Sequence, residues 1–309
     1  MKMDRVFPVA ALLFSIITPG WVFAQEVGDT DIVVTGERLL EEAAIRDAVR
    51  DMASEWRFDQ PLVRFHDPVC LFVSGLGNAG NAQVHGRLLA NARTAGVPVA
   101  EEGCRSNVLV LVVDDPETLV ERMADTQPRL IPSAKRRRLD AALARGEPVL
   151  VWHNEELRGT NGEEVRISST APGMPVTGPF SQFAAETRIN SHERARRFGA
   201  THSRTVVNGV IIIDIKHLIG MDLVRVADYA TMRLLVPGMR AASDSWDGAT
   251  EHEADEPRSI LGSFVAEHGA ERMTRFDRAW LNALYDLAPN AASTRLAGAV
   301  ARIYVSDEE

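Results

Sequence analysis

The stretch NVLVLVVDD, residues 107–115, decides the fold of this chain. From Val108 to Val113 every side chain is valine or leucine. A nearly unbroken run of this kind is typical of a strand that is buried on both faces, because a half-exposed strand would alternate apolar and polar residues. The run therefore predicts a buried strand in a sheet with packed helices.

The two aspartates that end this run have two explanations. Asp114 and Asp115 could ligate a metal, or Asp115 could cap a helix. Asp115 directly precedes Pro116 in DDPETLVERMAD, and proline is favoured at the first helical position behind an aspartate N-cap. We expect a helix from Pro116 and no metal site.

A strand and a helix precede the run. PLVRFHDPVCLFV, residues 61–73, is strand-like, and NAQVHGRLLANARTAG, residues 81–96, has a helical pattern. The chain has two cysteines, Cys70 and Cys104. In an oxidising compartment two such thiols form a disulfide; a pair of zinc ligands is the alternative, but a paired zinc-ligand spacing is missing. We expect a Cys70–Cys104 disulfide, worth about 4 kcal/mol in the chain-entropy model.

Between these elements, GLGNAG at residues 75–80 matches the G-x-G-x-x-G pattern of dinucleotide-binding loops. A strand and a turn are present, and Glu101 or Glu102 could supply the acid that contacts the ribose. Val84, however, stands where close helix–strand packing wants a small residue, and Pro98 cannot donate to a central ladder. We expect a turn that caps a helix, and no bound cofactor.

Later segments predict two hairpins and several helices. Residues 149–167 would form a hairpin around Gly159 and Gly162, and HSRTVVNGVIIIDI, residues 202–215, would form one around Asn208 and Gly209. Helical patterns cover residues 37–57, 221–235, 258–268, 274–287 and 292–305. Thr274 and Asp277 resemble a capping box for the helix that follows them.

Because strands and helices mix without strict β-α-β alternation, we predict an α+β protein. It would have a mixed sheet with packed helices, a disulfide-linked N-terminal β-α-β part and a helical C-terminal cap. The expected boundaries are residues 1–24 for a signal peptide, 25–60 for a leader with an amphipathic helix, and 61–309 for one α+β domain with its C-terminal helices from about 257.

The N-terminus has the pattern of a secretory signal. Lys2 and Arg5 precede an apolar stretch, and Val22 and Ala24 supply the small residues that signal peptidase requires. The break at Pro19-Gly20 argues against the alternative, a membrane anchor, which needs about 20 apolar residues. No cysteine follows Ala24 to carry a lipid. We expect an exported, periplasmic protein that is soluble and is not a lipoprotein.

The segment DIVVTGER, residues 31–38, resembles the segment near the N-terminus of mature TonB-dependent outer-membrane receptors. The resemblance implies docking by strand addition through Asp31 to Gly36. The chain is too short for a large outer-membrane barrel, and an ordinary edge strand or leader is the alternative.

The charge balance argues against nucleic-acid binding, because the formal net charge is −9 and nucleic acids demand a basic surface. One basic cluster exists, from Lys135 to Arg138. A charge run on an amphipathic helix is usually a solvated face. We interpret the cluster in this way, with contact to an anionic membrane surface as the alternative.

Asp228 is the one catalytic candidate, and a weak one. In MDLVRVADYATMRLL, residues 221–235, apolar residues surround nearly the whole helix, which predicts a buried helix. Asp228 would then be desolvated or paired with a partner such as an arginine, and a structural role is the favoured interpretation. His252 and Glu256 have a ligand-like spacing but stand in an acidic, proline-ended loop, and the chain lacks H-E-x-x-H and G-x-S-x-G motifs.

Several blocks, in order, resemble an uncharacterised family of alphaproteobacterial exported proteins of unknown function. They are DPVC, the glycine turn, GCRSNVLVLVVDD, EPVLVWHNEELRGTNG, ETRIN, VADYATM, SILGSF and TRFDRAWLNALY. The resemblance implies an envelope protein and carries over no catalytic residue. Two functions are open: a non-enzymatic periplasmic protein that binds or scaffolds an unknown envelope protein or ligand, and a hydrolase on a peptidase-like shell that uses Asp228.

Overall fold

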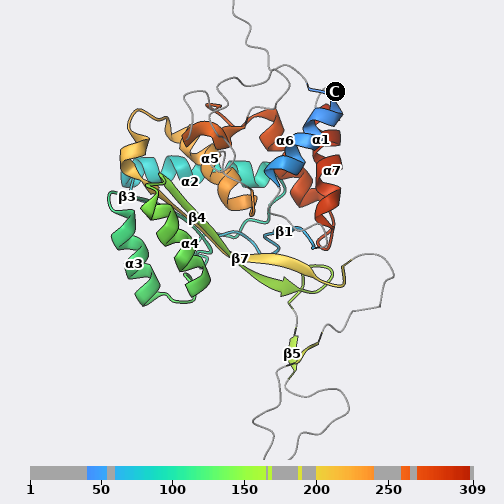
Figure 1. Ribbon diagram of the computed structural model, residues 1–309, viewed down its shortest axis with the longest axis horizontal. Helices are drawn as coiled ribbons and strands as arrows, with labels where there is room; N and C mark the ends of the chain where they lie inside the picture. Colours follow the sequence, from blue (N-terminus) through green and yellow to red (C-terminus); the bar gives the residue numbers. More distant parts are fainter. Residues whose placement is uncertain are drawn as a thin grey trace, which may run out of the picture. The chain divides into compact units, whose positions relative to one another are not determined.

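A five-stranded, mostly parallel sheet forms the centre of the protein (Figure 1). The computed structural model describes residues 40–53, 60–164, 166–168, 187–189, 200–239, 259–264 and 270–306. The strands of the sheet are β1 (Val63–Arg64), β2 (Leu71–Ser74), β3 (Val108–Val113), β4 (Val149–Arg158) and β7 (Ser203–Asp214). A separate antiparallel pair consists of β5 (Arg166–Ser168) and β6 (Thr187–Ile189).

The long strand β7 organises the sheet, because three other strands pair with it. Its residues 209–214 pair in parallel with β3, which in turn pairs in parallel with β2. Its first residues pair in parallel with the short β1. The other edge of β7 is covered by β4, which runs antiparallel to it and has a register shift between Asn154 and Glu155. Thus β4 is an outer strand of the sheet.

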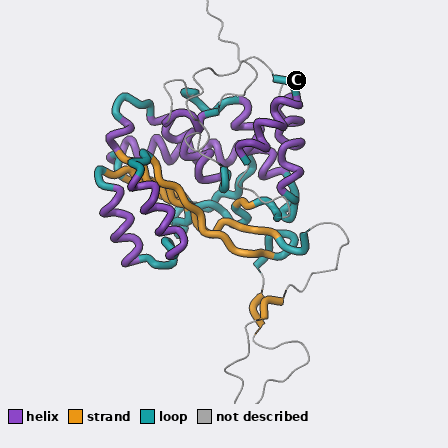
Figure 2. The backbone as a smooth tube through the Cα atoms, in the orientation of Figure 1, coloured by secondary structure: helices purple, strands orange, loops and turns teal. Residues whose placement is uncertain are grey.

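Helices cover both faces of the sheet (Figure 2). Each face has its own hydrophobic cluster. The smaller cluster includes Leu150, Trp152 and Ile212 and packs under α3 (Pro116–Thr126) and α4 (Ser133–Ala144). The larger cluster packs under α1 (Glu42–Met52), α2 (Gly77–Thr94), α5 (Leu223–Leu235), α6 (Arg275–Asp286) and α7 (Leu296–Ser306). Short 3-10 turns are η2 (Ile215–Leu218), η4 (Ile260–Phe264) and η5 (Ser293–Arg295). Since β3 and β7 lie between the two clusters, the apolar run of β7 is buried on both sides. The run of β3 is buried on one side and half-buried on the other.

The predicted α+β class and the predicted disulfide are both confirmed. Cys70 and Cys104 are bonded, with their Cα atoms 6.0 Å apart. Cys70 lies directly before β2, and Cys104 lies just before β3. The bond therefore joins the entrances of two neighbouring parallel strands on either side of α2.

Two predicted helix starts are confirmed in detail. The side chain of Asp115 accepts from the backbone N–H of Thr118 (3.0 Å), and Pro116 begins α3. Thr274 and Asp277 form the capping box of α6. Asp277 also accepts from the N–H of Ile260 (2.9 Å), so the same carboxylate connects η4 to the start of α6.

The predicted hairpin around Asn208 and Gly209 is wrong, because β7 runs through both residues without a turn. Asn208 accepts a hydrogen bond from the side chain of Asn154 on β4 (2.9 Å). A Cβ on Gly209 would lie 3.1 Å from the imidazole of His153, its cross-strand partner. The Asn-Gly pair, which is typical of a tight turn, therefore lies within β7 and contacts Asn154 and His153 of the neighbouring strand β4.

The predicted hairpin around Gly159 and Gly162 is also wrong. A turn does occur there, with the N–H of Gly162 donating to the carbonyl of Gly159 (3.0 Å). The partner of β4, however, is β7, and β5 pairs with β6. The apolar run of β7 buries more surface against β4 than residues 163–167, three of which are charged, could bury. This difference explains why β4 pairs with the distant β7.

Some predicted features lie outside the described residues: the signal peptide at 1–24, the docking segment 31–36, and His252 with Glu256. In the predicted helix over 37–57, the structure describes α1, which packs on α7 and places Ile45 and Val49 in the larger cluster. The C-terminal helices α6 and α7 are present. In the part of the chain that the structure describes, none of the helices has both the length and the apolar character needed to cross a membrane.

Candidate functional site

Asp228 lies on α5 with its side chain fully buried, and it faces α2. Arg87 on α2 donates to both carboxylate oxygens, from Nε at 2.7 Å and from Nη2 at 3.0 Å. Asn91, one turn further on, donates to Oδ1 (2.8 Å), and the backbone N–H of Met273 donates to Oδ2 (2.9 Å). The carboxylate thus connects α5, α2 and the start of α6.

Burial raises the pKa of Asp228, but its hydrogen bonds from Arg87, Met273 and Asn91 together outweigh burial and hold the pKa below its usual value. Asp228 is therefore an ionised, fully partnered carboxylate. Of the two alternatives for Asp228, desolvated or paired, the structure shows the paired one, with Arg87 as the partner. Both carboxylate oxygens accept hydrogen bonds from other parts of the protein, so the role of Asp228 is to hold α5 against α2 and the start of α6.

The glycines of GLGNAG have structural reasons of their own. Gly75 has a φ of +106°, and a Cβ there would lie 1.9 Å from the carbonyl oxygen of Val112. Gly77 begins α2 with a φ of +69°. The side chain of Asn81 accepts from the backbone N–H of Leu76 (3.0 Å). The motif thus lets the chain leave β2, pass close to β3 and enter α2.

The other described candidates for a nucleophile, a general base or a metal ligand do not form a cluster. Ser203 and Asp214 lie at opposite ends of β7, and Ser203 donates to the carbonyl of Gly159 (2.7 Å). Among the described residues, no group of three or more His, Cys, Asp and Glu side chains could hold a metal ion.

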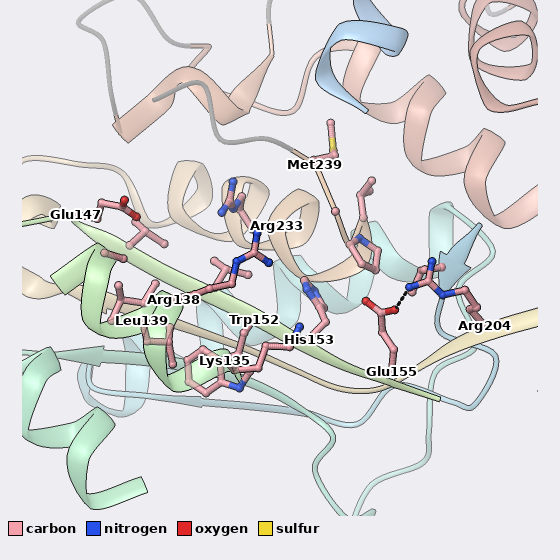
Figure 3. A pocket seen from close by; sticks show the side chains of 18 of the residues that line it. Lys135, Arg138, Leu139, Glu147, Trp152, His153, Glu155, Arg204, Arg233 and Met239 are labelled. Atoms are coloured by element: carbon pink, nitrogen blue, oxygen red, sulfur yellow. Dashed lines mark hydrogen bonds and ion pairs between the residues drawn. The ribbon is translucent and has the colours of Figure 1, made fainter. Parts of the chain in front are cut away.

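The feature that does resemble a site is a groove along the outer strand β4, with a volume of about 480 Å³ (Figure 3). Residues 149–153 of β4 form its floor. One wall is α4, and the other is the last turn of α5 with residues 236–239. We call this feature the β4 groove.

An ion pair stands at each end of the β4 groove. At one end Arg145 pairs with Glu147. At the other end Arg204 of β7 pairs with Glu155 of β4 at 2.5 Å (Figure 3). These glutamates are the acidic residues of the lining, and each is already neutralised by an arginine.

Between the two ends, Lys135 and Arg138 project from α4 and Arg233 projects from α5 (Figure 3). Within the described residues, none of these three side chains has a hydrogen bond or an ion pair with a carboxylate. Arg233 lies 6.0 Å from the centre of the Tyr229 ring, and its Nη1 atom is buried without a hydrogen-bond partner there. The groove therefore has three cations whose charge is not compensated.

His153 lies on the floor of the groove and is only 8% exposed. Its Nε2 donates to the carbonyl of Leu234 (2.9 Å). Burial, together with the nearby Arg233 and Lys135, lowers the pKa of His153 to about 4, although the bond to Leu234 opposes the shift. The histidine is neutral at pH 7 and adds no charge of its own.

Sequence reasoning found part of this site and missed the rest. It found the cluster from Lys135 to Arg138 but interpreted it as a solvated face. That interpretation holds for Arg136, which pairs with Asp140 (2.6 Å), and for the exposed Arg137 and Arg138. Arg138 also lines the β4 groove. Arg233 was missed, because only the fold brings the end of α5 opposite α4.

Comparison with known proteins gives no indication of function. No protein-family model matches the chain, and neither a curated protein nor a solved structure matches it.

Proposed function

We propose that this protein is an exported, envelope-associated binding protein that takes an anionic ligand in the β4 groove and catalyses no reaction. The observation that carries the proposal is the set of three uncompensated cations, Lys135, Arg138 and Arg233, around one concave surface. Export to the periplasm is part of the proposal because of the leader at residues 1–24 and the Cys70–Cys104 disulfide.

The arrangement favours anions for a physical reason. Two opposite charges attract more strongly at a partly desolvated surface than in bulk water. The guanidinium groups of Arg138 and Arg233 can each donate two parallel hydrogen bonds to a carboxylate, phosphate or sulfate. The Nη1 of Arg233 is buried without a hydrogen-bond partner in the described part of the chain, so the protein itself does not satisfy this guanidinium.

Binding is favoured over the hydrolase function by the state of Asp228. Its oxygens are held by Arg87, Asn91 and Met273. A general base or nucleophile would need a free oxygen directed into a pocket. The β4 groove is lined by other residues.

Calorimetric titration tests the proposal with citrate, poly-L-glutamate and dextran sulfate as anionic probes and dextran as the neutral control. The test variant is K135Q/R138Q/R233Q. The matched control is R93Q/R137Q/R302Q, which removes the same charge from exposed residues outside the groove.

We expect at least one anionic probe to bind the wild type with an affinity that falls as salt rises. The groove variant should bind at least 10-fold more weakly than the control variant. Equal weakening by both variants, or no binding of any anion, would contradict the proposal.

A further inference from the structure

The edge of β4 that faces away from β7 has a pattern of backbone hydrogen-bonding groups. This pattern narrows the class of ligand that the β4 groove can bind. The N–H of Asp214 donates to the carbonyl of Pro148 (3.0 Å), so these two residues form a hydrogen-bonded pair of the antiparallel ladder. In such a ladder, hydrogen-bonded and non-hydrogen-bonded pairs alternate. Leu150 and Trp152 therefore turn their backbone groups toward β7, and the residues between them turn theirs away from it.

The residues that turn away are Val149, Val151 and His153, paired in register with Ile213, Ile211 and Gly209. In the described part of the chain, neither the ladder nor a side chain provides a partner for their outward N–H and C=O groups. All three line the β4 groove. The groove floor is thus a row of alternating backbone donors and acceptors.

The length of this edge is limited by the structure on both sides. Pro148 precedes it, and the register shift between Asn154 and Glu155 follows it. Five residues at about 3.3 Å each give an edge of roughly 16 Å. This length accepts a short strand of four or five residues.

We propose that the β4 groove binds an extended peptide segment with acidic side chains, which adds to β4 as a further strand of the sheet. This inference rests on the proposed function, since it names the ligand class of the same groove. A peptide backbone supplies both donors and acceptors to Val149, Val151 and His153. A polyphosphate or a sulfated sugar without donors toward the edge would leave their carbonyl groups unpaired.

The cations predict where the acidic side chains stand. Side chains of a strand alternate between the two faces of its sheet. One face of the added strand would meet Lys135 and Arg138 on α4, and the other would meet Arg233 on α5. Two neighbouring acidic residues therefore place one carboxylate on each face.

The probe is the acetylated and amidated heptapeptide VTEEVTV, titrated into the full-length mature protein. One control is VTQQVTV, which keeps the shape and removes the charge. A second control is VTEEVTV methylated on the backbone nitrogens of both glutamates. Neighbouring N–H groups point to opposite edges of a strand, so this control removes a donor from each edge and keeps the charge.

We expect VTEEVTV to bind at least 10-fold more tightly than either control. Amide exchange followed by NMR gives a second signature. In the free protein the amides of Val149, Val151 and His153 should exchange faster than those of Leu150 and Trp152, and VTEEVTV should slow them at least 10-fold. An anion held only by the cationic side chains would not produce this alternating pattern.

The protein side of the pairing is tested by V151P, with V151T as its control. Proline is tolerated on an edge strand where its missing N–H would point outward. V151P should therefore keep the fold and weaken VTEEVTV at least 10-fold, while V151T binds normally. The two peptide controls carry the test by themselves if V151P does not fold.

The outcomes separate the two proposals. If the methylated peptide binds as tightly as VTEEVTV, or if citrate and dextran sulfate bind in the groove while the peptide does not, strand addition is wrong and anion binding stands. If no anion binds through the three cations, the proposed function itself is wrong.

Discussion

Hydrogen-bond partners distinguish the buried carboxylates that hold this fold from the cations of the β4 groove. Asp228 and Asp277 have no exposed surface, and each accepts several hydrogen bonds from named groups. Arg138 and Arg233 project into the β4 groove without a carboxylate partner among the described residues. Buried charges are costly unless they are paired. Substitutions at the two kinds of residue should therefore have different effects.

Asp228→Ala should destabilise the fold by about 3 kcal/mol, because it leaves Asn91 and the N–H of Met273 without their acceptor. Asp228→Asn should lower the free energy of unfolding by about 2 kcal/mol, because the new NH₂ group would face a hydrogen-bond donor in place of an acceptor. Urea denaturation measures both, with Asp125→Asn on the surface of α3 as the control. A stable Asp228→Ala protein would refute the structural role.

Gly209→Ala should destabilise the fold by about 1 kcal/mol, because the new methyl group would displace the imidazole of His153 at 3.1 Å. In a His153→Ala background the same change should be neutral or stabilising, since the remaining neighbour, Leu234 Cδ2, lies at 3.4 Å and alanine has less conformational entropy to lose. A double-mutant cycle from denaturation curves checks this. Equal effects in both backgrounds would show that His153 does not require the glycine.

The lowered pKa of His153 predicts how stability depends on pH. The unfolded chain binds a proton near pH 6.5, whereas the folded chain binds it only near pH 4. Stability should therefore be fully present above pH 6.5 and fall, by up to roughly 3 kcal/mol, as the pH falls toward 4. His66 has a pKa lowered to about 4 as well and acts in the same direction.

His153→Gln isolates the contribution of His153 in urea denaturation between pH 4.5 and 7.5. The variant should be less stable than the wild type at pH 7.5, and the difference should shrink as the pH falls. A difference that stays constant across this range would mean that His153 is not the group responsible.

Sequence patterns located the buried aspartate but not its partner. The apolar helix around Asp228 indicated a carboxylate that is either desolvated or paired, with an arginine as one candidate partner. Arg87 lies 141 residues away, in the helix that follows the glycine turn, and only the packing of α2 on α5 brings the two together. Arg233 was missed for the same reason, because its opposite wall, α4, is distant in sequence.

At the scale of elements, local signals for helix caps were reliable, whereas local signals for hairpins were not. Asp115 and the Thr274–Asp277 pair acted within one helical turn, as predicted. The Asn208-Gly209 pair indicated a tight turn, yet β7 passes through it because Val210–Ile213 gain more by complete burial between two helical layers. Burial of a long run outweighs a turn preference of two residues.

The disulfide joins the starts of β2 and β3, which are also paired in the sheet. Its loss should therefore lower stability without changing the fold. Cys70→Ser/Cys104→Ser should unfold about 4 kcal/mol more easily than the wild type, because the unfolded chain regains the entropy of the loop. Denaturation in urea with and without reductant measures this, and reductant should not affect the variant. A variant as stable as the oxidised wild type would show that strain cancels the gain.

At the scale of the whole molecule, the β4 groove explains why the sequence alone indicated no site. Its floor is β4, its walls are α4 and the end of α5, and one end is closed by Arg204 of β7. These parts are joined by the sheet and not by proximity in the chain. The fold class followed from runs such as 107–115. The position of the candidate site follows from the edge of the outer strand β4 that faces away from β7, which has no strand paired to it among the described residues.

Formation of the Cys70–Cys104 disulfide should depend on export of this protein. We expect the mature chain to begin at Gln25 and to contain the Cys70–Cys104 bond, since both follow from export. A version that lacks residues 2–24 should stay in the cytoplasm with both thiols reduced. N-terminal sequencing and thiol alkylation of the two fractions measure this, and the substitution Ala24→Phe should block cleavage. An intact leader on the native protein, or a bonded cysteine pair in the leaderless one, would contradict the coupling.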